Sequence, residues 1–155
     1  MSDSESPANP ALYRQVIAVL ALVAGLIALY LHLVKIGKFG IPACGPGHGC
    51  VTAWYSPWGT FMGFDVALIG AVGYGLLTVV AFVGAMPHNE DNPLFTTIIF
   101  ALVIAAIAFT WRLKYGEWVV MKIFCIWCFE SFLTIHACLL LAWLDRRRLA
   151  SAREA

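Results

Sequence analysis

Four long runs of apolar residues constrain this chain more than any other feature. The runs cover residues 16–34, 66–86, 94–111 and 123–144, and charged residues or prolines bound each of them. A helix that crosses a bilayer needs about 20 apolar residues. Helices also satisfy their own backbone hydrogen bonds in lipid, whereas open strands do not. The sequence therefore predicts an all-α integral membrane protein, a four-helix bundle that forms a single domain over residues 1–155.

The composition excludes several other classes of protein. Hydrophobic residues make up 61% of the chain and charged residues 12%, whereas about a quarter of a soluble protein is charged. The formal net charge is +1 and no basic stripe is present, so we expect no nucleic-acid partner. The first ten residues are polar and acidic, and we do not expect them to act as a signal peptide.

A long connection separates the first apolar run from the second. This loop, residues 35–65, contains two cysteines and several aromatic residues, and long loops in compact domains are usually functional. We expect it to cap the active site, with a short helix from about Pro57. Because the chain crosses the membrane four times, the loop and the start of the fourth run must share one side. The arginines at 146–148 favour cytoplasmic termini.

Four of the five cysteines form two pairs. Cys44 and Cys50 flank the loop motif C-G-P-G-H-G-C, whose glycines and proline favour a turn that brings the sulfurs within disulfide reach. Cys125 and Cys128 form C-I-W-C, which places them on one helix face at a helix start that favours a thiolate. Two dithiols on one side of a membrane can pass two electrons from a soluble thiol to a lipid-phase oxidant.

Other interpretations of the cysteines remain open. A c-type haem site needs a histidine after the second cysteine, and Phe129 is found there instead. A zinc site of four cysteines with His48 as a spare ligand is possible. So is a structural disulfide in the loop beside two free cysteines. Farther along the last run, Glu130 could provide a proton path or lie at the rim, and we expect His136 to hydrogen-bond another helix.

Several motifs together resemble the vitamin K epoxide reductase family of membrane thiol oxidoreductases. The run at 50–59, C-V-T-A-W-Y-S-P-W-G, is similar to the family's C-x5-S-x-W-G signature. The stretch V-A-L-I-G-A-V-G-Y at 66–74 resembles the family's second helix, and C-x-x-C opens the last helix. The resemblance covers nearly the whole chain.

The resemblance implies a role for each cysteine. Cys44 would exchange with a separate thioredoxin-like partner, Cys50 would relay electrons to Cys125, and Cys128 would react with a quinone. The quinone would be of the ubiquinone, menaquinone or phylloquinone type. The implied location is the bacterial inner membrane with the active site facing the periplasm or exterior; the alternative is the endoplasmic reticulum membrane.

Three further positions are candidates for quinone binding. Ser56 would donate a hydrogen bond to the quinone or to the reactive thiolate. Phe132 stands where family members that reduce the epoxide have a tyrosine. The family's quinone-facing asparagine near the start of the second helix is not evident, and Asp65 and Val66 occupy that region. The loss of these two donors favours disulfide formation coupled to quinone reduction. The alternatives are a vitamin K epoxide or quinone reductase and a non-catalytic metal-binding membrane protein. An unrelated four-helix quinone-linked enzyme would have the two cysteine motifs in the reverse order.

Overall fold

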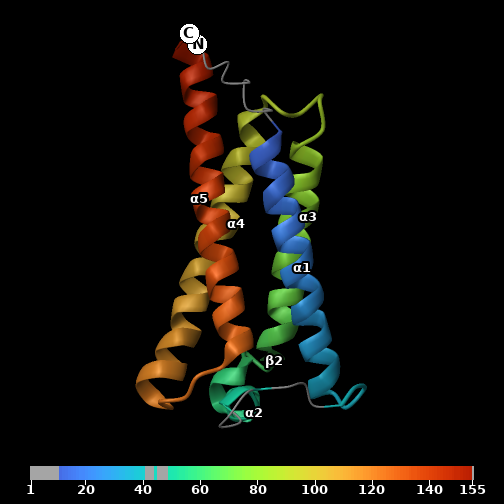
Figure 1. Cartoon of the computed structure of the whole chain (residues 1–155), viewed down its shortest axis with the longest axis vertical. Helices are drawn as coiled ribbons and strands as arrows, with labels where there is room; N and C mark the ends of the chain where they lie inside the picture. Colours follow the sequence, from blue (N-terminus) through green and yellow to red (C-terminus); the bar gives the residue numbers. More distant parts are fainter. Residues whose placement is uncertain (1–10, 41–43, 45–48, 155) are drawn as a thin grey trace, which may run out of the picture.

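Four long helices run side by side in the computed structural model, which describes residues 11–40, 44 and 49–154 (Figure 1). These helices are α1 (Leu12–Lys35), α3 (Val66–Gly84), α4 (Pro93–Tyr115) and α5 (Ile126–Glu154). Within the described residues, four stretches are long and apolar enough to cross a membrane: Leu12–Lys35, Val66–Gly84, Pro93–Val120 and Ile126–Ala152. The predicted integral membrane four-helix bundle is confirmed.

The last two helices are longer than their apolar runs. α4 continues into a short π-helix, η2 (Gly116–Val120), and α5 extends well past residue 144. Charged residues near these ends lie over aromatic rings. The guanidinium of Arg112 is 5.1 Å from the ring centre of Trp58, and the guanidinium of Arg147 is 3.8 Å from the ring centre of Trp143. Helices therefore continue where the apolar run stops, because hydropathy marks what suits lipid and not where a helix ends.

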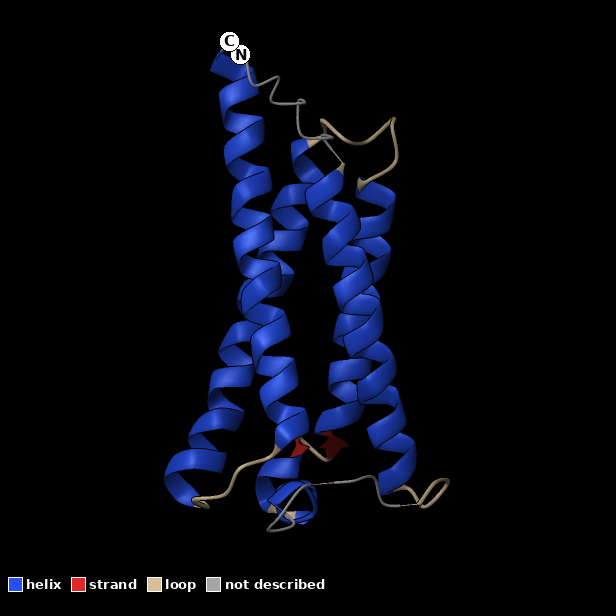
Figure 2. Ribbon diagram, in the orientation of Figure 1, coloured by secondary structure: helices blue, strands red, loops and turns tan. Residues whose placement is uncertain are grey.

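A small cap connects α1 to α3 at one end of the bundle (Figure 2). It consists of α2 (Gly49–Tyr55), the 3-10 helix η1 (Pro57–Gly59), and the antiparallel strands β1 (Thr60–Phe61) and β2 (Phe64–Asp65). The short helix expected from Pro57 is only this 3-10 turn, and the longer helix precedes it. Ser56 begins the turn because its hydroxyl accepts the N–H of Trp58 at 3.2 Å.

A buried polar network ties the four helices together at the opposite end, where α1 begins and α5 ends (Figure 1). Arg14 on α1 is fully buried and its Nε donates to Asp145 on α5 at 2.9 Å. The same guanidinium donates to the Gly84 carbonyl of α3 and to the Thr96 hydroxyl of α4. Between the two ends the core is apolar and includes Cys138, which is therefore separate from the paired cysteines.

Candidate active site

The four paired cysteines meet at the capped end of the bundle. Cys50 lies on α2, Cys125 directly precedes α5, and Cys128 is in the first turn of α5. Cys50 and Cys125 are both fully buried and pack together, with Cys44 and Cys128 beside them. Figure 1 shows α2 below the start of α5. The prediction that both pairs share one side is confirmed.

The sulfurs form a continuous row. Sγ of Cys50 donates to the Cys44 carbonyl at 3.8 Å, and the thiols interact in the order Cys44, Cys50, Cys125 and Cys128. All four are free thiols in the structure. Thiol–disulfide exchange requires a thiolate to reach a neighbouring disulfide sulfur, and the order in which these four side chains pack together suits such a transfer.

A glycine lets α2 approach the start of α5 this closely. A Cβ atom placed on Gly49 would overlap the carbonyl oxygen of Phe124, which directly precedes Cys125. The backbone of α2 therefore packs on the backbone just before the C-I-W-C motif. Any larger residue at position 49 would push Cys50 away from Cys125.

Burial and neighbouring thiols outweigh any effect of the helix start and raise the pKa of Cys44, Cys50 and Cys125. Backbone N–H groups do point at the sulfurs: Val51 at Cys44, Ile126 at Cys50, and Cys128 at Cys125. Even so, burial and the Cys50 thiol raise the pKa of Cys44 to about 11. Burial also raises the pKa of Cys50. The Cys128 thiol and burial raise the pKa of Cys125. The expectation that the helix start favours a thiolate is therefore wrong for Cys125.

A buried ion pair from α4 and η2 holds the start of the cysteine motif. Oε1 of Glu117 accepts the backbone N–H of Cys125 at 2.6 Å, and Oε2 accepts Nζ of Lys114 at 2.8 Å. Glu117 is 2% exposed and Lys114 1%. Glu117 was not among the expected site residues, because residues 112–122 fall between the third and fourth apolar runs. The lysine three residues before the glutamate was the available signal, since such spacing pairs charges on a helix.

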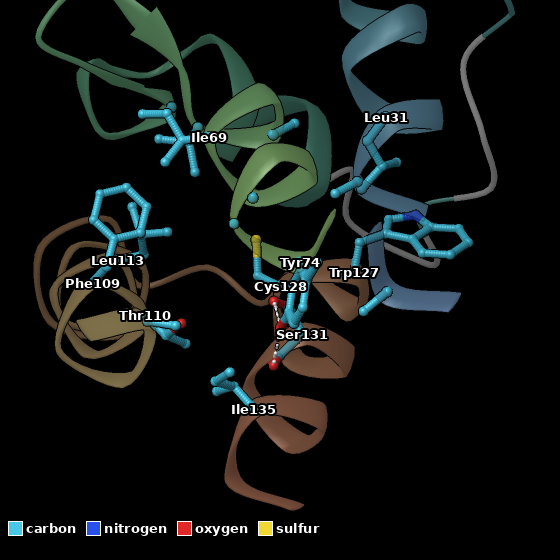
Figure 3. A pocket seen from close by; sticks show the side chains of 18 of the residues that line it. Leu31, Ile69, Tyr74, Phe109, Thr110, Leu113, Trp127, Cys128, Ser131 and Ile135 are labelled. Atoms are coloured by element: carbon cyan, nitrogen blue, oxygen red, sulfur yellow. Dashed lines mark hydrogen bonds between the residues drawn. The ribbon is translucent and has the colours of Figure 1, made fainter. Parts of the chain in front are cut away.

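A cavity of about 350 Å³ opens beside Cys128. All four long helices and the cap contribute to its wall, and the walls are mostly apolar. Figure 3 shows Phe109 and Leu113 of α4, Trp127 of α5 and Leu31 of α1 around the Cys128 sulfur. Small-molecule sites of about 300–1,000 Å³ with mainly apolar walls are typical of proteins, so the space is sufficient for a planar ring.

Asp65 lies at the edge of this cavity and is already paired. Its carboxylate oxygens lie 2.8 Å from Nζ of Lys35 and 2.7 Å from Nδ1 of His32. Burial raises the pKa of Asp65, but the hydrogen bonds from Lys35 and His32 outweigh it and hold that pKa below its usual value. The residue is therefore an anion that these two α1 side chains fix in place.

The other two candidate quinone contacts lie off the cavity. Ser56 and Phe132 are absent from the described residues that line it. The Ser56 hydroxyl donates to the Ala53 carbonyl at 2.7 Å, and the Phe132 ring packs against Trp111 and His136. Their assignment to quinone binding stays a prediction.

The remaining polar residues of α5 have partners on α5 itself. Glu130 lines the cavity and accepts the Thr134 hydroxyl at 2.9 Å. His136 hydrogen-bonds the Phe132 carbonyl of its own helix, not another helix as expected. His48 lies outside the described residues. Where the chain is described, no three His, Cys, Asp or Glu side chains gather in a way that could hold a metal ion.

A membrane bundle with a row of four thiols leading to an apolar cavity defines a membrane-embedded thiol oxidoreductase. The comparison with known families agrees: the model of the Vitamin K epoxide reductase family matches residues 15–143. Because this match covers most of the chain and all four paired cysteines, the protein belongs to the vitamin K epoxide reductase family, as the sequence motifs indicated.

Proposed function

We propose that this chain oxidises the dithiol of a separate thioredoxin-like protein and passes the electrons to a membrane quinone, in support of disulfide formation. The observation that carries this proposal is the row of sulfurs from Cys44, which is partly exposed, to Cys128 in the cavity wall. Cys44 is accessible to a soluble partner, whereas the cavity suits a lipid-soluble molecule.

The first exchange takes place at the loop pair. With Cys44 and Cys50 joined as a disulfide, a partner thiolate attacks the Cys44 sulfur and releases the Cys50 thiolate. The second thiol of the partner then attacks the partner sulfur that is bonded to Cys44 and releases the Cys44 thiolate. The partner leaves as a disulfide, and Cys44 and Cys50 hold the two electrons.

The second exchange moves the electrons to the helix pair. The Cys50 thiolate attacks Cys125 of a Cys125–Cys128 disulfide and releases Cys128. Cys44 then attacks Cys50, which restores the loop disulfide and releases Cys125. The N–H of Ile126 at Cys50 and the N–H of Cys128 at Cys125 stabilise negative charge on these sulfurs during exchange.

The cavity residues support a quinone as the final acceptor. A bound quinone supplies an acceptor for the two electrons and two protons that the Cys125–Cys128 dithiol releases when it becomes a disulfide. The apolar walls exclude water, and Cys128 faces the space (Figure 3).

The core shared by the four helices supports a single domain. The arginine-rich end of α5 supports an orientation with the cysteines outside the cytoplasm of a bacterium.

The proposal is tested with the purified chain in detergent, a reduced thioredoxin-like protein and a short-chain ubiquinone. We expect thiol oxidation only when quinone is present, and we expect Cys128→Ser to abolish it. Cys138→Ser is the matched control and should keep the rate, because Cys138 lies in the core away from the row. A Cys128→Ser variant with the full quinone-dependent rate would contradict the proposal.

A further inference from the structure

A buried hydrogen-bond donor without a partner lies next to Cys128 in the chain. Nε1 of Trp127 is buried, and it is the one buried side-chain nitrogen or oxygen in the described part of the chain for which no acceptor or donor is present. Trp127 also lines the cavity. Nearly all buried polar groups in proteins have a partner, and an orphaned one calls for an explanation.

Several other polar side chains around the same cavity already have partners. The hydroxyls of Tyr74 and Ser131 lie 2.8 Å apart, as the dashed lines in Figure 3 show. Glu117 binds Lys114, and Glu130 binds a threonine one turn along α5. The Trp127 N–H is therefore the buried donor for which a bound ligand would supply the missing acceptor.

The chemistry of the donor restricts what that ligand is. The indole nitrogen only donates and never accepts, so its partner must carry an acceptor oxygen. A water molecule would need two to four polar partners, whereas the walls of this cavity are mostly apolar. An acceptor carried on an apolar molecule meets both conditions.

We propose that Nε1–H of Trp127 donates a hydrogen bond to a carbonyl oxygen of the quinone headgroup. This inference rests on the proposed function, because it assigns a contact to the quinone in that site. Figure 3 shows the indole on the α1 side of the Cys128 sulfur and Phe109 and Leu113 on the other side. Trp127 and Cys128 line the same cavity, so a headgroup held by Trp127 would share that space with the sulfur that reacts. The contact would supply a donor that Phe132 and Asp65 do not.

The contact is tested by nuclear magnetic resonance of the indole N–H groups. The protein with 15N-labelled tryptophan gives up to six indole signals, one for each tryptophan, and Trp127→Phe identifies the signal of residue 127. We expect this signal to move downfield when a short-chain ubiquinone is added. A hydrocarbon with the same tail and no headgroup should leave it unmoved, because it offers no acceptor.

Trp127→Phe keeps an aromatic ring and removes the donor. We expect it to bind ubiquinone about fivefold to tenfold more weakly, the usual worth of one neutral hydrogen bond. Trp143→Phe is the matched control, since Trp143 lies near the other end of α5 and does not line the cavity. It should bind as the unmodified chain does.

Two outcomes overturn the inference, and they are distinguishable from failure of the proposed function. If Trp127→Phe keeps quinone-dependent turnover with an unchanged KM for quinone, the function stands and the contact is wrong. If none of the indole signals of the unmodified, active protein responds to ubiquinone, the contact is wrong as well, and this test needs no variant. Absence of quinone-dependent turnover in the unmodified chain overturns both.

Discussion

At the scale of single residues, the environment of each sulfur matters more than its place in a motif. Cys44 is only partly buried, yet desolvation and the neighbouring thiols keep it protonated near neutral pH. A protonated thiol is a poor nucleophile but is stable against unwanted oxidation. In the first exchange the partner supplies the attacking thiolate, whereas the later attack of Cys44 on Cys50 requires that Cys44 first lose its proton.

The raised pKa of Cys44 gives a prediction about pH. Because its pKa is about 11, the thiolate fraction should rise about tenfold per pH unit from pH 7 to beyond pH 10. A cysteine with the ordinary pKa of about 8.5 levels off earlier. Mass spectrometry of iodoacetamide labelling at Cys44 in the reduced protein measures this. A plateau at or below about pH 10, as expected for an ordinary cysteine, would contradict the account, and the chain unfolded in detergent provides the reference curve.

The contact at Gly49 predicts a sharp effect of one methyl group. Gly49→Ala should lower quinone-dependent oxidation of the partner at least tenfold, because the new Cβ must move α2 away from Phe124 and so Cys50 away from Cys125. Gly75→Ala is the control, since a Cβ there meets no atom within 4 Å. Circular dichroism should show unchanged helix content in both variants. Equal rates for Gly49→Ala and Gly75→Ala would show that the close approach is unnecessary.

At the scale of elements, a buried ion pair of α4 and η2 accepts a hydrogen bond from the backbone just before α5, so that α4 is joined to the start of α5 by more than apolar packing. The Lys114–Glu117 pair connects α4 and η2 to the first residue of the C-I-W-C motif. π-helical turns such as η2 often occur at functional sites. Here the turn extends α4 far enough for Glu117 to reach the backbone of Cys125.

Breaking this pair should destabilise the protein by about 3–5 kcal/mol, as expected when one buried charge loses its partner. Glu117→Leu leaves both Lys114 and the Cys125 N–H without an acceptor, so we expect a lower Tm and slower exchange. The double variant Lys114→Met with Glu117→Gln keeps an acceptor and removes both charges. It should recover most of the stability and rate. Thermal unfolding in detergent measures the Tm of each variant and of the unmodified chain. An unchanged Tm for Glu117→Leu would refute the role assigned to the pair.

At the scale of the whole molecule, the sequence predicts the large features because they depend on local composition. Four apolar runs require four spanning helices, and their even number places the loop and the C-I-W-C motif on one side. Both features are present in the structure (Figure 1). Parity needs no knowledge of side-chain contacts, so it is insensitive to errors in helix boundaries.

The details of the site depend on contacts between distant segments and could not be predicted this way. Glu117 belongs to the site because it accepts the backbone N–H of Cys125, and this hydrogen bond forms where α4 packs on α5. The protonated state of Cys125 likewise arises from burial and the adjacent thiol, which a motif does not encode. The orphaned N–H of Trp127 becomes visible only once its surroundings are known.

The direct test of the account is whether Cys50 and Cys125 can bond. In the double variant Cys44→Ala with Cys128→Ala, these two are the remaining cysteines of the row, and mild oxidation should join them in nearly every molecule while Cys138 stays free. Peptide mapping without reductant measures the product. A quantitative Cys50–Cys125 disulfide is the predicted result. Recovery of both residues as free thiols in the folded, oxidised protein would contradict an electron route through them.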